Sequence, residues 1–378
     1  MNRQDDSEQL PSHQHNADVD LLAREHDAPP MWGASIGWIL SIFVAAAAYG
    51  VEYLPFPPFQ VVEPTGAVRA PLSAAIIAIL LGAIIRNVAK LPSSVSFGCR
   101  AIVRYVIPLA IVLVGAGLNL AVVRSIGMVS MAIIIVCILL ALGAAYAVGT
   151  ALGLPRKTSV LLGAGTAICG SSAIVAIAPL IKADSKDLVL SVSTVYLTGV
   201  AFMLTMPAIG TALGMSPEAF GVWVGTSIHA VPQAVTAGFA IADAGEVATL
   251  VKLVRVAMLA PLALLIALLA ANGRGEIRSI RIMQLVPWFI WGFVGMAIVS
   301  TIVRMPDVLD EETMADAANV LAWINRAGTV LLTLSMAAIG LEVDLREMAR
   351  VGSRALLACA VASVILAAGS YVMISLVL

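Results

Sequence analysis

Two apolar stretches of the sequence share one pattern of small polar residues, and these residues are the best suited to bind a ligand. The first stretch, Val160 to Pro179, contains GTAICG at 165–170, and the related string GTSIHA follows at 225–230. Glycine costs a helix about 1 kcal/mol relative to alanine, and backbone groups that a helix break sets free cannot face lipid. Apolar segments interrupted by glycine at corresponding positions typically mark the binding site of a transporter.

We predict that the middles of these two segments meet near the bilayer midplane and bind the substrate there. Backbone N–H groups at helix starts carry partial positive charge, which suits an oxyanion. The alternative is that the small residues only let the helices pack closely. The predicted substrate-binding residues are Thr166, Cys169, Gly170, Ser171, Ser172, Thr226, Ser227, His229, Gln233, Lys252 and Arg255.

Three of these residues can carry charge. Lys252 and Arg255 lie three residues apart in an otherwise apolar run, so they share one helix face. A charge within a membrane needs a cavity or a partner, and we expect both to face an anion. Alternatively, they snorkel to the surface or Glu246 neutralises one of them. His229 matches Cys169 in position. The unperturbed pKa of a histidine, about 6.5, would allow proton coupling; alternatively, His229 is a hydrogen-bonded structural residue.

The composition predicts an all-α polytopic membrane protein. Of the 378 residues, 60% are hydrophobic and 12% are charged, against about 45–50% and about 25% in soluble proteins. The apolar residues come in runs of roughly 20, the length that crosses a bilayer. The net charge of −1 does not indicate partners. We expect the lipid bilayer as surroundings and no nucleic acid.

Other sequence features limit the chemistry. The four cysteines are scattered, without CxxC pairs or histidines at metal-ligand spacing, so we expect neither a disulfide framework nor a metal site. The sequence contains no Walker motif, dinucleotide fingerprint or haem-ligand pattern, and we expect no cofactor and no ATP-driven mechanism. Residues 1–31 are polar, with three of the four histidines, and we expect a disordered tail without a cleaved signal.

Residues 32–378 are expected to form one transport domain with two inverted halves. The first half, about 32–214, holds one glycine-broken segment at 158–181, and the second, about 215–378, holds the other at 218–240. Basic loops indicate a cytoplasmic N-terminus. We favour two re-entrant hairpins over the alternative of eleven crossings. The nine predicted full spans cover about 36–54, 72–85, 105–118, 128–152, 188–213, 247–271, 285–302, 320–341 and 355–378.

The inversion rests on a second pair of related motifs. Gly117-Leu118-Asn119-Leu120 ends the third predicted span, and Gly340-Leu341-Glu342-Val343 ends the penultimate one. Counting positive charges in the loops places the first motif outside and the second inside. If both glycine-broken segments crossed fully, they would run parallel and break this symmetry, whereas two hairpins preserve it.

At these residues the chain resembles the YeiH-type family of sulfate exporters, over about residues 33–378. The resemblance implies a protein of the bacterial inner membrane that exports an anion. An acidic residue usually follows the position of His229 in that family, whereas this chain has Ala230, and Pro232 replaces a small residue. This departure bears on ion coupling. The matching strings are AILLG at 78–82 with Arg86-Asn87, ICGSSAI at 168–174 with Lys182-Ala183, AFGVWVGTSIH at 219–229, LVKLVRVAMLAP at 250–261 and AAIGLEVDL at 337–345.

The leading functional hypothesis is a secondary transporter of a small anion, sulfate or an organosulfur anion, that works by alternating access. A carrier of organic carboxylates coupled to Na⁺ or H⁺ is the first alternative, and a homodimer is a candidate assembly. An intramembrane enzyme that uses Cys169 as nucleophile and His229 as base is less favoured, because no third group is evident to orient them. We therefore expect a protein that is not an enzyme. A passive channel fits the interrupted inverted halves less well than a carrier.

Overall fold

The protein is built almost entirely from helices. The structure, a computed structural model, describes residues 31–54, 61–62, 68–69, 73–89, 91–118, 120–241, 243–270, 287–305, 310–344 and 352–377. The tail predicted at 1–31 lies outside these residues except for Met31. The helices are α2 (Met31–Glu52), α3 (Ala74–Val88), α4 (Ser93–Ala101), α5 (Ile107–Val114), α6 (Leu120–Ala151), α7 (Arg156–Ala167), α8 (Ser171–Ile177), α9 (Ser185–Ala212), α10 (Pro217–Ser227), α11 (Val231–Gly238), α12 (Gly245–Ala257), α13 (Leu259–Ala270), α15 (Trp288–Val303), α16 (Glu311–Glu342) and α18 (Ser353–Val377).

Helices dominate because a backbone in hydrocarbon must satisfy its own hydrogen bonds. The described β-structure is one two-residue antiparallel pair, β1 (Val61–Val62) with β2 (Val68–Arg69). Seven helical segments are long and apolar enough to cross a membrane, and the apolar helices α3 and α15 are shorter. The predicted all-α polytopic class is confirmed. The count of nine full spans stays a prediction.

The third predicted span begins earlier than the sequence suggested, at Ser94 rather than about 105. α4 continues into α5 through a π-helical turn at Ile102–Val106. Pro108 follows this turn and has no N–H to donate to the carbonyl of Arg104, so the helix widens instead of ending. Arg100 and Arg104, which precede the predicted span, therefore lie on this helix.

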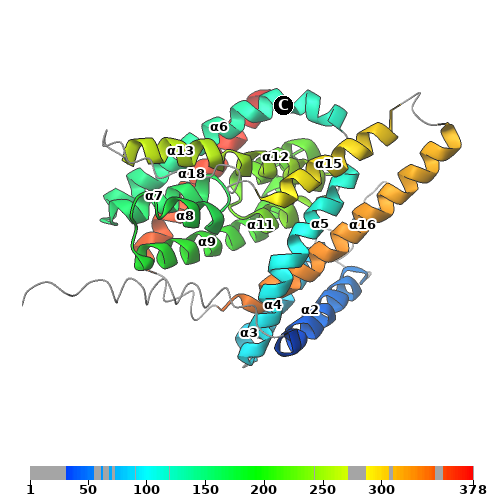
Figure 1. The fold of residues 1–378 in the computed structure, drawn as a ribbon, viewed down its shortest axis with the longest axis horizontal. Helices are drawn as coiled ribbons and strands as arrows, with labels where there is room; N and C mark the ends of the chain where they lie inside the picture. Colours follow the sequence, from blue (N-terminus) through cyan, green and yellow to red (C-terminus); the bar gives the residue numbers. More distant parts are fainter. Residues whose placement is uncertain are drawn as a thin grey trace, which may run out of the picture.

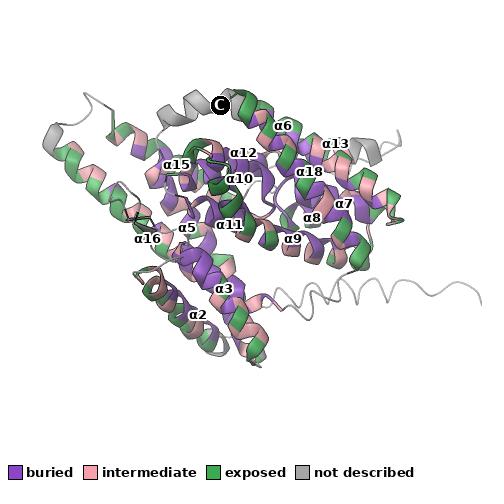
Figure 2. Ribbon diagram, turned by 180° about the vertical axis from the view of Figure 1, so that it is seen from behind, coloured by how far each residue is buried: buried purple, intermediate pink, exposed green. Residues whose placement is uncertain are grey.

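The helices form two bundles that lie side by side (Figure 1). The first, which we call the scaffold bundle, is centred on α16, which packs against α2, α3, α4 and α5. The second, the hairpin bundle, contains α6 to α13 and α18, with α6 against α7 and α18, and α12 against α10 and α11. Figure 2 shows buried residues concentrated where α10, α11 and α12 meet. α15 packs against α5 and so belongs to the scaffold bundle. The two bundles contact each other where α11 meets α16 and α3, and where α15 meets α6.

Close packing within the scaffold bundle depends on glycine. A Cβ atom on Gly340 of α16 would lie 2.4 Å from the carbonyl oxygen of Ile79, and one on Gly82 of α3 would lie 2.8 Å from that of Ala337. The two backbones therefore touch where α3 crosses α16. In membrane bundles, small residues at helix crossings commonly allow two helix backbones to approach this closely.

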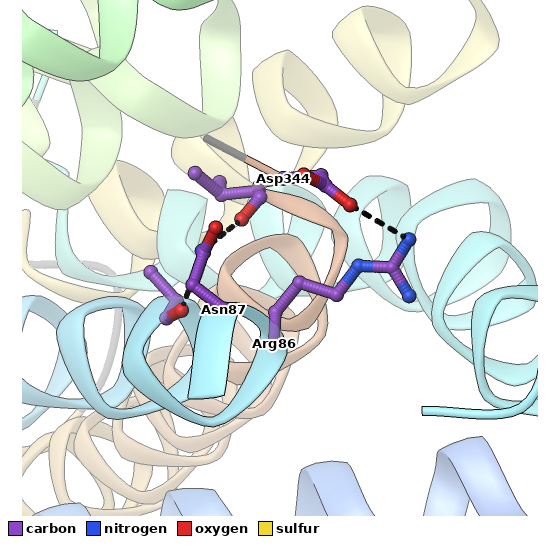
Figure 3. Close-up of polar contacts among 5 residues, drawn as sticks. Arg86, Asn87 and Asp344 are labelled. Carbon is purple, nitrogen blue, oxygen red and sulfur yellow. Dashed lines mark hydrogen bonds and ion pairs between the residues drawn. The ribbon is translucent and has the colours of Figure 1, made fainter. Parts of the chain in front are cut away.

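A polar clamp fixes the end of the same crossing (Figure 3). The Arg86 guanidinium lies 3.4 Å from the Asp344 carboxylate, and Asn87 Nδ2 donates to the Val343 carbonyl oxygen at 2.7 Å. Arg86 and Asn87 are residues that the family resemblance singled out. In this structure they hold the end of α3 to the segment that follows α16.

The first glycine-broken segment enters and leaves at the same end of the hairpin bundle. Lys157 Nζ, at the start of α7, donates to the Lys182 carbonyl oxygen beyond α8 at 2.5 Å. Thr158 Oγ1 donates to Asp187 Oδ1 at the start of α9, also at 2.5 Å. A crossing segment would hold its ends about 30 Å apart, beyond the reach of a lysine side chain. The first segment is therefore a re-entrant hairpin.

The second segment repeats this arrangement. A Cβ atom on Gly221, near the start of α10, would lie 2.8 Å from the Ala244 carbonyl oxygen just before α12. The chain thus returns after α11 to the end where α10 began. The 28 residues of α9 cover about 42 Å at 1.5 Å per residue and lead from the base of the first hairpin to the base of the second. The hairpins enter from opposite ends, as the inverted symmetry predicted.

Labelling of single cysteines tests this topology. We expect Lys157→Cys and Lys182→Cys to react with a membrane-impermeant maleimide from one side only, and Glu218→Cys and Asp243→Cys from the other. All four side chains are exposed. The wild-type protein is the control, because its four cysteines are buried. Labelling of Lys157→Cys and Lys182→Cys from opposite sides would instead support eleven crossings.

Candidate functional site

The tips of the two hairpins meet, as predicted. Each tip is a three-residue break, between α7 and α8 and between α10 and α11. Gly170 in the first tip has φ +75° and ψ −127°, a conformation that is open to glycine and strained for other residues. A Cβ atom on Gly170 would lie 3.8 Å from the Cα atom of Ala230 in the second tip. The chain thus reverses at Gly170, directly against the other hairpin.

Lys252 and Arg255 of α12 join the two tips. Lys252 Nζ donates to the carbonyl oxygens of Ile168 and Ile228 at 2.7 Å each, one from each hairpin. Arg255 Nε donates to Ala167 at 2.5 Å and its Nη1 to Ile228 at 3.0 Å. These carbonyls end α7 and α10, where a helix lacks internal donors and carries partial negative charge. The full set of acceptors is Thr166, Ala167, Ile168, Gly225 and Ile228.

Both cations are fully buried, with 0% of each exposed. They do not snorkel to the surface. Glu246 does not neutralise them either, since it accepts a hydrogen bond from Asn325 at 3.0 Å. Among the described residues no carboxylate forms an ion pair with either cation. Two helix C-termini at about −0.5 charge each offset about one of the two positive charges, so the tips keep a positive excess.

The C-terminal helix α18 supports both hairpins, a role that the sequence reasoning missed. Thr226 Oγ1 lies 2.6 Å from Ser370 Oγ, and Thr166 Oγ1 lies 3.6 Å from Cys359 Sγ. Ser363 takes the third such position, beside His229. Spacings of four and seven residues place these three α18 residues on one helix face. That small polar stripe in an apolar run is the signal that could have revealed the contact.

His229 is buried beside α18. Its Nε2 atom lies 2.8 Å from Ser363 Oγ, whose proton goes to the Cys359 carbonyl oxygen at 2.7 Å. Nε2 therefore donates, and in the neutral ring Nδ1 would then be an acceptor. Nδ1 has no partner among the described residues. His229 thus contacts α18 through one ring nitrogen and leaves the other without a hydrogen bond. Among the described residues it forms no hydrogen bond with Cys169.

The remaining predicted residues divide into two groups. Gln233 caps α11: its Oε1 accepts from the Ala230 N–H at 3.2 Å and its Nε2 donates to the Tyr196 carbonyl oxygen at 3.1 Å. Thr166, Thr226 and Gln233 thus have partners within the protein. Ser227 Oγ is buried without a partner among the described residues, whereas Ser171 and Ser172 are exposed at the start of α8.

Comparison with known proteins agrees with this membrane architecture. A family model described as Conserved hypothetical protein 698 matches residues 37–359. A UPF0324 membrane protein of Agrobacterium fabrum is 33% identical over 80% of this chain and 83% of its own length. A second, from Bartonella henselae, is 34% identical over 90% of this chain and 92% of its own. No solved structure matches the chain. The chain therefore belongs to the UPF0324 family of membrane proteins, the Conserved hypothetical protein 698 family, and the resemblance to the YeiH-type family is confirmed.

Proposed function

We propose that this protein is a secondary transporter of a small anion, with sulfate or an organosulfur anion as the leading substrate class. The observation that supports the proposal most is the pair of fully buried cations, Lys252 and Arg255, at the junction of two inverted hairpins. A buried charge that lacks a counter-charge is costly. An anion bound at the tips would supply the missing negative charge.

The groups around the tips suit an oxyanion. The exposed hydroxyls of Ser171 and Ser172 and the buried hydroxyl of Ser227 can each donate a hydrogen bond. In the first turn of α11, the N–H groups of Val231 and Gln233 lack intrahelical acceptors and carry partial positive charge, whereas Pro232 has no N–H. His229 Nδ1 would become a further donor on protonation, which couples anion binding to a proton in this proposal.

The arrangement of the two bundles supports alternating access as the mechanism of this proposal. The hairpins enter the hairpin bundle from opposite ends, so a ligand at the tips could be released toward either side. The hairpin bundle meets the scaffold bundle mainly through α11 and α15, and movement of one bundle against the other would switch the open side. We place the protein in the bacterial inner membrane with a cytoplasmic N-terminus, and export is the proposed direction.

Flux into proteoliposomes tests the proposal. We expect saturable uptake of labelled sulfate by the wild-type protein, with competition from sulfite, thiosulfate and short sulfonates. The double variant Ser171→Ala, Ser172→Ala should raise KM about tenfold or more, since a hydrogen bond to a charged group contributes about 1.5–3 kcal/mol. Ser375→Ala is the matched control, because Ser375 is also exposed but donates to Val372 near the end of α18.

The other outcomes decide between the remaining functions. Competition by dicarboxylates but not by sulfate would favour the carboxylate carrier. A Cys169→Ser variant with unchanged flux would dispose of a nucleophilic role for that thiol. Absence of saturable flux for every anion tested, from protein that remains monodisperse, would overturn the transporter proposal.

A further inference from the structure

We infer that the Lys252 ammonium takes the place of a coupling metal cation between the two hairpin tips, so that this carrier works without Na⁺. The inference deepens the proposed transport function, and its test by anion flux rests on that function. Its test by thermal denaturation does not, because that test concerns only which cation lies between the tips. It starts from the carbonyl oxygens where α7 and α10 end.

Carbonyl oxygens at the ends of interrupted helices are the groups with which many transporters coordinate Na⁺. Here Ile168 and Ile228 offer one such oxygen from each hairpin, and both lie 2.7 Å from Lys252 Nζ. The ammonium thus bridges two elements that enter from opposite ends of the bundle. This is the bridging role that a bound monovalent cation would have.

Arg255 occupies the other carbonyl oxygens at the breaks. Its guanidinium donates to Thr166 and Ala167 of the first hairpin and to Gly225 and Ile228 of the second. The two side chains together engage five carbonyl oxygens. A metal ion would have to displace them, and it would meet two fixed positive charges at short range.

A carboxylate that would offset the charge of an added metal cation is also missing from the described part of the site. No described carboxylate pairs with Lys252 or Arg255, and Glu246 is held by Asn325. The positive charge between the tips is therefore supplied by side chains of α12 itself. The same contacts tie both tips to one helix, so the hairpins move together with α12.

Thermal denaturation of the purified full-length protein tests this inference without any assay of transport. We expect the Tm of the wild type to be equal in NaCl, KCl and choline chloride of the same ionic strength. Lys252→Ala should have a lower Tm and should regain at least half of the loss with Na⁺ or with ethylammonium, which can enter the vacated volume. Lys252→Met is the matched control, because its uncharged side chain fills that volume and should prevent rescue.

Three results would overturn the inference: stabilisation of the wild type by Na⁺ over choline, failure of every cation to rescue Lys252→Ala, or equal rescue of Lys252→Met. Should Lys252→Ala not fold, the wild-type comparison still decides. In proteoliposomes, wild-type anion flux should persist when choline replaces Na⁺, and strict dependence on Na⁺ would contradict the inference. If no anion is transported at all, the proposed function fails while the denaturation results still judge the role of Lys252.

Discussion

Replacing Arg255 with alanine is expected to destabilise the protein by at least about 3 kcal/mol, the largest effect of any substitution considered. The guanidinium is fully buried and donates to four carbonyl oxygens at the ends of α7 and α10. Hydrogen bonds to a charged group contribute about 1.5–3 kcal/mol each, and unpaired buried carbonyls add their own cost. A lower Tm in detergent and a reduced yield of monodisperse protein should report the loss.

Two further variants separate the causes of this effect. Arg100→Ala removes a cation of the same kind, but its side chain is 62% exposed and forms one ion pair with Glu342 at 3.2 Å. Such surface pairs contribute about 0–1 kcal/mol, so little change is expected. Arg255→Lys keeps the positive charge but loses the planar guanidinium with its several N–H donors. Its Tm should lie between those of Arg255→Ala and Arg100→Ala. Equal Tm values for Arg255→Ala and Arg100→Ala would refute the bracing role of Arg255.

The positions of the helices and hairpins could be predicted from the sequence because the bilayer imposes strong rules. Apolar runs of about 20 residues identify spans, and broken segments stand out because glycine is unfavourable in a helix. The hairpin topology followed from symmetry, since the motifs at Gly117 and Gly340 are inverted and only re-entrant hairpins make the two glycine-broken segments inverted as well. Each of these three inferences uses a local sequence pattern or the symmetry of the two halves, and none requires knowledge of side-chain packing.

The partners of the charged residues could not be predicted in the same way. Lys252 and Arg255 were expected to face a ligand, but most of their N–H groups are engaged by carbonyl oxygens from residues 24 to 89 positions away. Which carbonyls are free depends on where each helix breaks, and this is fixed by tertiary structure. The role of α18 was missed for a related reason, because Cys359 and Ser363 look like ordinary small residues of an apolar span.

Replacing Gly170 with alanine is expected to cost about 1–3 kcal/mol of stability, because its backbone conformation is strained for any residue with a Cβ atom. The added atom would lie 3.8 Å from Ala230, an ordinary contact, so the cost arises from φ +75° rather than from a clash. Relief of the strain would shift the first tip against the second, and anion flux should fall about tenfold or more if 1.4 kcal/mol or more of binding is lost. Gly143→Ala is the matched control: Gly143 lies within α6 with nothing within 4 Å of its added Cβ, so helix propensity predicts an unchanged or higher Tm. Wild-type Tm and flux in Gly170→Ala would mean that the reversal at the tip does not depend on glycine.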